Sequence, residues 1–82
     1  MTEPGPQVVD ARGHRCPVPS LRLRKALAGY PDGARVVLLA TDPMARIDVP
    51  WLMTELGGQV VSIEADDGVL RITVETPAAP TD

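Results

Sequence analysis

The chain has 82 residues, which is enough for one small domain, and its two aromatic residues leave a mainly aliphatic core. Its single cysteine, Cys16, excludes an internal disulfide. With the single histidine it supplies too few soft ligands for a structural zinc site, which takes about four. The net charge of -3 argues against a protein whose main task is to bind polyanionic nucleic acid. We therefore expect neither a metal nor a cofactor, and no direct contact with nucleic acid.

The hydrophobic residues are spread along the chain rather than gathered in one segment. The longest uninterrupted apolar run is Val36 to Ala40, far short of the ~20 residues that span a bilayer. No charged and then apolar leader opens the sequence. We expect a cytoplasmic protein with no membrane contact. It consists of one domain over residues 7–75 between flexible tails at 1–6 and 76–82, which are rich in Pro, Gly, Ala and polar residues.

The first half of the domain predicts a strand, a helix and a second strand. Val8 and Val9 begin a short strand. The segment from Pro17 to Tyr30 has a helical apolar stripe that includes Leu23 and Leu27. Residues 34–40 form a continuous apolar, β-branched run, which is typical of a buried central strand.

A second helix follows Asp42, which is placed to cap it, and Pro43. Its apolar stripe contains Ala45, Val49, Leu52, Met53 and Leu56. Pro50 removes the hydrogen bond to the carbonyl of Arg46, so the helix either kinks there or follows a short turn as a main helix capped by Asp48. We favour the second alternative.

The second half closes with two strands. Val61, Ile63 and Ala65 alternate with polar residues, and so do the apolar residues between positions 70 and 74, while Asp67 and Gly68 form the turn between the strands. The order is β-α-β-α-β-β, in which two crossovers imply parallel neighbours and the hairpin adds an antiparallel strand. We therefore predict an α/β (α+β) two-layer sandwich, a four-stranded mixed sheet with two helices on one face.

Cys16 stands directly before Pro17, which predicts that the cysteine caps the first helix at the positive end of its dipole. Pro17 and Pro19 both fall in the first turn, where a missing N–H costs little, and the N–H groups of Val18 and Ser20 are free to face a thiolate. Nearby cations add positive potential, which lowers a thiol pKa; they are Arg12, Arg15 and Arg22. We expect an exposed, activated thiol rather than a small buried hydrophobe.

The residues around the cysteine resemble a known family. Positions 9–19 read VDARGHRCPVP, similar to the LDxxGxxCPxP opening of the TusA (SirA-like) sulfur-carrier family, and further matches follow at Ala40 to Pro43 and Asp48 to Pro50. The resemblance covers roughly residues 7–75. It implies a fold like the C-terminal domain of a bacterial translation initiation factor, with sheet order 1-2-4-3.

The resemblance also implies the chemistry. Cys16 matches the cysteine that carries sulfur as a persulfide, taken from a cysteine desulfurase or rhodanese-like donor and passed to an acceptor sulfurtransferase. Pro17 and Pro19 match the prolines that shape its loop, and Asp10 and Gly13 match the residues that lead into it. We expect Gly13 to permit a tight approach and Asp10 to accept hydrogen bonds from loop N–H groups.

Two positions depart from the members that thiolate tRNA. Val18 stands where those members often have an acidic residue, and Ile47 stands where they often have a basic one. These departures argue against tRNA thiolation specifically and leave the carrier chemistry untouched. The donor, the acceptor and the pathway stay open; a monomer suits a carrier that meets successive partners.

Several residues have two interpretations. Asp42 either contacts the cysteine loop or a partner, or only caps the second helix. Arg22 and Lys25 either bind an acidic partner or form a solvated basic face. Ile47 and Trp51 form either an exposed docking patch or a partly covered one.

The histidine and the function of the whole protein also have more than one interpretation. His14 lies two residues from the cysteine, close enough for a Cys/His pair, although no acid is clearly placed to orient it. Two further functions compete with sulfur transfer: an RNA- or ribosome-binding module without thiol chemistry, and a thiol redox sensor.

Overall fold

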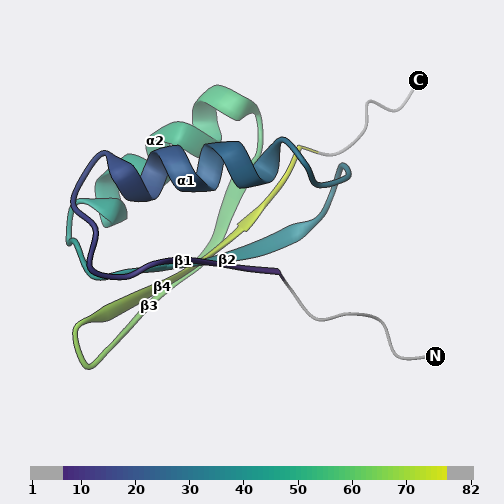
Figure 1. Cartoon of the computed structure of the whole chain (residues 1–82). Helices are drawn as coiled ribbons and strands as arrows, with labels where there is room; N and C mark the ends of the chain where they lie inside the picture. The colour runs from purple at the N-terminus through teal and green to yellow at the C-terminus, as the bar shows by residue number, and fades with distance from the viewer. Residues whose placement is uncertain (1–6, 78–82) are drawn as a thin grey trace, which may run out of the picture.

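The protein is a two-layer sandwich in which two helices cover one face of a four-stranded sheet (Figure 1). The computed structural model describes residues 7–77. The elements in chain order are β1 (Gln7–Ala11), α1 (Val18–Leu27), β2 (Arg35–Ala40), α2 (Ala45–Leu56), β3 (Gln59–Asp66) and β4 (Val69–Glu75). The predicted fold class and element order are confirmed.

The strands lie in the order β1-β2-β4-β3, which is the order that the family resemblance implies. β1 and β2 are parallel neighbours, as the first crossover predicts. The second crossover, taken alone, implies that β2 and β3 are also neighbours, and this is wrong. β4 lies between them and pairs antiparallel with both. β4 buries three apolar side chains in the core, whereas β3 carries Glu64 and Asp66, and charged residues suit an edge strand.

One hydrophobic core lies between the sheet and the two helices. β2 is the most deeply buried strand, as predicted, and the helices contribute Leu23 and Leu27 from α1 and four residues of the predicted stripe from α2. The buried core residues are Ala11, Leu23, Leu27, Val36, Leu38, Ala40, Ala45, Val49, Leu52, Met53, Leu70, Ile72 and Val74. The aliphatic core expected from composition is confirmed.

Helix α2 runs unbroken through Pro50, so the predicted start of a main helix at Asp48 is wrong. The buried side chains lie on both sides of the proline, Ala45 and Val49 before it and Leu52 and Met53 after it. Their packing offsets the loss of one backbone hydrogen bond, because helices in proteins are stabilised mainly by their buried face. α2 ends at Gly57 with φ 82°, the left-handed geometry that favours glycine.

The β3–β4 hairpin closes through Asp67 and Gly68 as predicted, and both residues have positive φ. A β-bulge at Val61 shifts the register, so that Val60 pairs with Val74 and Ser62 with Thr73. The bulge turns Val61 outward, and Val60 packs on the core instead. The predicted inward position of Val61 is therefore wrong.

The fold continues beyond residue 75. Thr76 is 6% exposed; its hydroxyl donates to the carbonyl of Pro31 and accepts the N–H of Ala34, each over 2.8 Å. The carbonyl of Pro77 accepts the N–H of Gly33 over 3.2 Å. The expected tail therefore does not begin at residue 76; residues 1–6 and 78–82 lie outside the described residues.

We predict that Thr76→Val lowers the free energy of unfolding by about 1–3 kcal/mol, because it leaves two backbone groups at this closure without their hydroxyl partner. Urea unfolding measures the loss. The matched control is Thr73→Val on β4, the strand that ends just before Thr76; the Thr73 side chain makes no hydrogen bond within residues 7–77, and this variant should stay within about 0.5 kcal/mol of the parent. Equal losses of unfolding free energy in both variants would contradict the role of the Thr76 hydroxyl in closing the fold.

Candidate functional site

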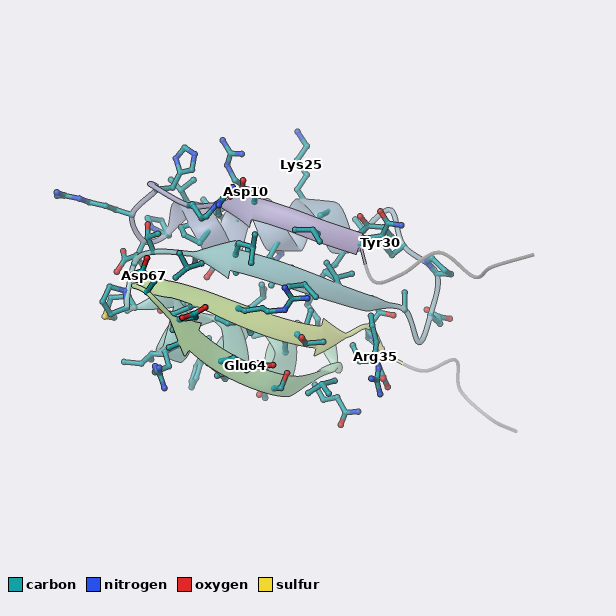
Figure 2. All side chains as sticks on the ribbon, turned by 90° about the horizontal axis from the view of Figure 1, so that it is seen from below. Asp10, Lys25, Tyr30, Arg35, Glu64 and Asp67 are labelled. Carbon is teal, nitrogen blue, oxygen red and sulfur yellow. The ribbon has the colours of Figure 1, made fainter. Side chains whose placement is uncertain are left out.

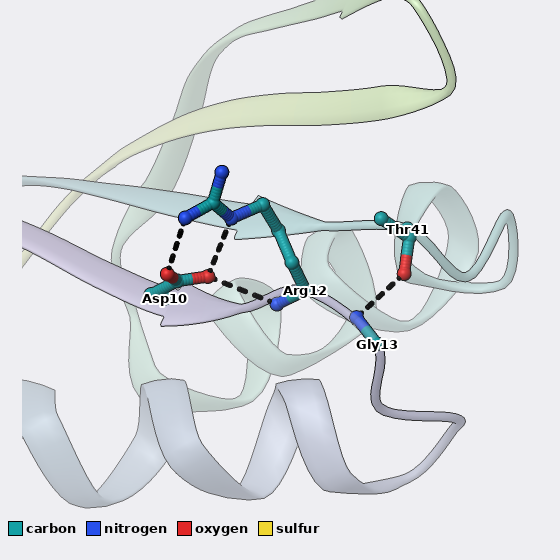
Figure 3. A network of polar contacts seen from close by, with 4 residues as sticks. All are labelled: Asp10, Arg12, Gly13 and Thr41. Atoms are coloured by element: carbon teal, nitrogen blue, oxygen red, sulfur yellow. Dashed lines mark hydrogen bonds and ion pairs between the residues drawn. The ribbon is translucent and has the colours of Figure 1, made fainter.

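Two loops meet at one edge of the sheet because β1 and β2 are parallel and end side by side, with Ala11 opposite Ala40. Two hydrogen bonds tie the loops together. The N–H of Gly13 donates to the hydroxyl of Thr41 over 2.8 Å (Figure 3), and the N–H of Cys16 donates to Oδ2 of Asp42 over 2.6 Å. The loop that carries the cysteine is therefore held by the loop after β2.

Asp10 and Arg12 form a closed pair at the start of the cysteine loop (Figure 3). Asp10 accepts the N–H of Arg12 over 3.1 Å, as predicted for a loop N–H, and also two side-chain donors of Arg12 over 2.9 and 2.7 Å. The guanidinium bonds lower the pKa of Asp10 to about 2. Arg12 is thus engaged by Asp10, and the expectation that it stabilises the thiolate is not supported.

Cys16 is exposed, as predicted, but it does not cap α1. The cap position is Pro17, which follows a cis peptide bond, and the helix begins at Val18. The N–H of Val18 donates to the carbonyl of Arg15 over 2.9 Å, so it does not face the sulfur. The predicted arrangement of helix N–H groups around a thiolate is therefore wrong for Val18.

The Cys16 thiol faces a carboxylate instead of a helix end. Its Sγ donates a hydrogen bond to Oδ2 of Asp48, a residue of the first turn of α2. This bond, together with desolvation and the negative charges of Asp48 and Asp42, raises the pKa of the Cys16 thiol above its ordinary value. The expectation of a lowered thiol pKa is wrong, because the nearest charged group is an acid rather than one of the arginines.

Asp42 contacts the cysteine loop, one of the two roles that the sequence left open, but the predicted capping of α2 is wrong, because the cap residue is Met44. One oxygen accepts the N–H of Cys16, and the other accepts the N–H of Met44 over 3.0 Å at the start of α2. These bonds lower the pKa of Asp42, the bond from Cys16 most. Its contact with the cysteine loop is confirmed, and the same carboxylate also supports the turn into α2.

A groove of about 250 Å³ runs from Cys16 between the two helices. Pro17, Ser20, Leu21 and Arg24 line it from the α1 side, and Asp48, Trp51, Leu52 and Glu55 line it from α2. Leu21 is 58% exposed and Trp51 72%, while Arg24 and Glu55 approach to 3.9 Å. Ile47 is 64% exposed, so of the two alternatives for Ile47 and Trp51 the structure supports the exposed patch, and Trp51 lines the same groove as the cysteine.

The other predicted residues lie outside the groove that contains Cys16. Arg15 is exposed on the cysteine loop near Asp42. Arg22 and Lys25 lie on the exposed side of α1, and Lys25 projects past the edge of β1 (Figure 2). His14 lines a different hollow, with Gly13, Arg15, Thr41, Asp42 and Pro43, whereas the thiol bonds Asp48.

The two motif prolines differ in their surroundings. Pro17 is exposed on the rim of the groove, whereas Pro19, in the first turn of α1, is fully buried. Pro19 therefore contributes to the core as well as to the loop. Within residues 7–77 no three side chains of His, Cys, Asp or Glu gather into a metal-binding cluster.

Among the residues of the site that sequence reasoning missed are Asp48, Thr41 and Arg24. Asp48 and Thr41 both lie in segments that match the family pattern, so the match itself was a signal that these positions have a role. Arg24 carries no such signal, because its place on the groove depends on how α1 packs beside α2.

The comparisons with known proteins agree with this geometry. The family model for "Sulfurtransferase TusA" matches residues 7–76. A relative in Archaeoglobus fulgidus, named "Putative sulfur carrier protein", is 43% identical over 82% of this chain and 88% of its own. The "Sulfur carrier protein TusA" of Pseudomonas paraeruginosa is 32% identical over 83% of this chain and 86% of its own.

A solved structure shares the fold. The crystal structure of a SirA-like protein from Desulfitobacterium hafniense superposes with a TM-score of 0.75 at 31% identity, over 85% of this chain and 96% of that one. The chain therefore belongs to the TusA family of sulfur carriers. Among the described residues, no helix has the length and apolar character needed to cross a membrane.

The Asp10–Arg12 pair gives a prediction about pH. Because the folded pKa of Asp10, about 2, lies below its ordinary 3.8, the pair stabilises the fold above pH 3.8 and loses that contribution as the pH falls through about 2. An NMR titration of the Asp10 carboxyl should show this midpoint. Arg12→Gln should return it toward 3.8, and an unchanged midpoint would contradict the pairing.

A further prediction concerns Asp42. Asp42→Ala removes the acceptor of the Cys16 N–H, so this amide should exchange with solvent at least about tenfold faster while core amides keep their protection. Hydrogen exchange followed by NMR measures both. Asp32→Ala, an exposed acid in the turn before β2, is the matched control and should leave Cys16 unchanged.

Proposed function

We propose that this protein carries sulfane sulfur as a persulfide on Cys16, between a donor protein and an acceptor sulfurtransferase. A cysteine desulfurase or a rhodanese-like protein is the donor class. The observation that carries the proposal is the position of Cys16: the only cysteine of the chain, exposed at the mouth of a groove, on a loop fixed by Asp42 and Thr41.

The transfer is a thiol–persulfide exchange that leaves the oxidation state unchanged overall. The Cys16 thiol loses its proton, and its sulfur attacks the outer sulfur of a donor persulfide, R–S–SH. A new S–S bond forms on Cys16 as the donor S–S bond breaks, and the leaving thiolate takes up a proton to give R–SH. In the second exchange, the acceptor thiolate attacks the outer sulfur of the Cys16 persulfide; a new S–S bond forms on the acceptor, the S–S bond at Cys16 breaks, and the Cys16 thiolate takes up a proton.

The surroundings of Cys16 suit a partner that brings its own sulfur. Leu21 and Trp51 offer exposed apolar area beside the thiol, and such patches typically mark docking sites. Arg15 on the cysteine loop, and Arg22 and Lys25 on the exposed side of α1, lie outside the groove and offer positive charge to acidic residues of a partner. We propose a monomer that works in the cytoplasm, since one loop must meet a donor and an acceptor in turn.

Sulfur loading tests the proposal. Incubated with a cysteine desulfurase, its cofactor and cysteine, the protein should gain one sulfur atom, seen in the intact mass and removed by a thiol reductant. Cys16→Ser should gain none, while Asp32→Asn, an exposed acid in the turn before β2 and outside the groove, should load as the parent does.

The outcome also separates the competing functions. Failure to load from a desulfurase, a rhodanese and a small-molecule persulfide alike would defeat the carrier proposal. If the protein is an RNA- or ribosome-binding module, Cys16→Ser should bind as the parent does. If it is a redox sensor, Cys16→Ser should lose the response to oxidation, and the parent should accept no sulfur from any donor.

A further inference from the structure

Asp48 is the one residue of α2 whose side chain bonds the sulfur of Cys16. It lies in the first turn of α2, half-buried, on the wall of the groove that also holds the thiol. Within residues 7–77 its carboxylate forms no ion pair, while the neighbouring groove acid, Glu55, is paired with Arg24. Among the described residues, Cys16 is therefore the one side chain that hydrogen-bonds the Asp48 carboxylate.

The other charged groups near the thiol do not cancel this effect. Asp42, from the loop after β2, adds a second negative charge. Arg15, on the cysteine loop, lies near Asp42, and Arg12 is held by Asp10. The hydrogen bond places one proton between the Cys16 sulfur and Asp48, and the negative charges of Asp48 and Asp42 favour keeping it on sulfur, so the free protein presents a thiol rather than a thiolate.

We propose that Asp48 holds Cys16 as a protonated, slowly reacting thiol in the free carrier, and that a docked donor protein activates the cysteine by displacing the Asp48 carboxylate. This rests on the proposed carrier function. It gives the site selectivity, because sulfane sulfur on small molecules meets the restrained thiol, whereas a protein in the groove between Leu21 and Trp51 contacts Asp48 directly.

The proton balance follows from the exchange. In the free carrier the proton stays in the Cys16–Asp48 hydrogen bond. When a donor moves the carboxylate away, the thiol loses both its acceptor and the adjacent negative charge, and its proton leaves to water. The thiolate attacks the donor persulfide, and the released donor thiolate binds a proton, so no net oxidation or reduction occurs.

Alkylation against pH tests the restraint without any sulfur donor. Cys16 is the only cysteine, so iodoacetamide labelling followed by intact mass reports it alone. The parent should show a midpoint above that of the same chain unfolded in urea. Asp48→Asn and Asp48→Ser should lower the folded midpoint by about one pH unit, since each removes a like charge in contact with the thiol.

The matched control is Glu55→Gln, which removes an acid from the same groove without touching the sulfur, and its midpoint should equal that of the parent. Emission of Trp51, the only tryptophan, reports whether each variant keeps the native groove. Asp48→Ser retains a side chain suited to a first helical turn, so one of the two Asp48 variants serves if the other misfolds.

Loading then tests the displacement step. A small-molecule persulfide at pH 7 should load Asp48→Asn about threefold faster than the parent, because a tenfold larger thiolate fraction is partly offset by lower nucleophilicity. Loading by a desulfurase should rise less, so the ratio of protein-donor to free-persulfide rates should fall in Asp48→Asn and stay constant in Asp32→Asn, an exposed acid outside the groove.

Three results would overturn the inference: unchanged alkylation midpoints in both Asp48 variants, an equal shift in Glu55→Gln, or a ratio of loading rates that Asp48→Asn leaves unchanged. If Cys16 accepts sulfur from no donor, the carrier function fails, and the alkylation midpoints still decide whether Asp48 restrains the thiol.

Discussion

The parallel pairing of β1 with β2 is the constraint on which the site depends. Two parallel neighbours end at the same edge of a sheet, so the loop after Ala11 and the loop after Ala40 emerge side by side. Gly13 thereby meets Thr41, and Cys16 meets Asp42, although 28 and 26 residues separate the partners along the chain. The crossover through α1 supplies both the pairing and the helix that closes the groove.

The site balances two opposing electrostatic influences. The loop carries arginines, which favour a thiolate, yet the groups that contact the cysteine are carboxylates: Asp42 at its N–H and Asp48 at its sulfur. The contacts decide the outcome, because charge interactions near a surface weaken quickly with distance and are screened by salt. In the mechanism that we propose, this balance keeps Cys16 a slowly reacting thiol until a docked donor alters the groove.

The comparison of sequence and structure shows where local patterns fail. The stripe of α2 was predictable, but its continuity through Pro50 was not, because packing of Val49 and Leu52 outweighs one lost hydrogen bond. Alternation placed Val61 inward, whereas the bulge places Val60 there, since the register belongs to the β3–β4 pair. The helix dipole predicts a lowered pKa for Cys16, but the contact with Asp48 raises that pKa, and Asp48 lies 32 residues away along the chain.

The sequence by itself determined the element order, the aliphatic core, the Asp67–Gly68 turn and the family pattern around an exposed cysteine, because each depends on neighbouring residues. Tertiary structure alone decided that the bulge in β3 turns Val61 outward, that Thr76 closes the fold, and that an acid faces the thiol. These features arise from contacts between distant segments, whose free energies sum over the whole fold and leave no periodic signal in any one stretch of chain.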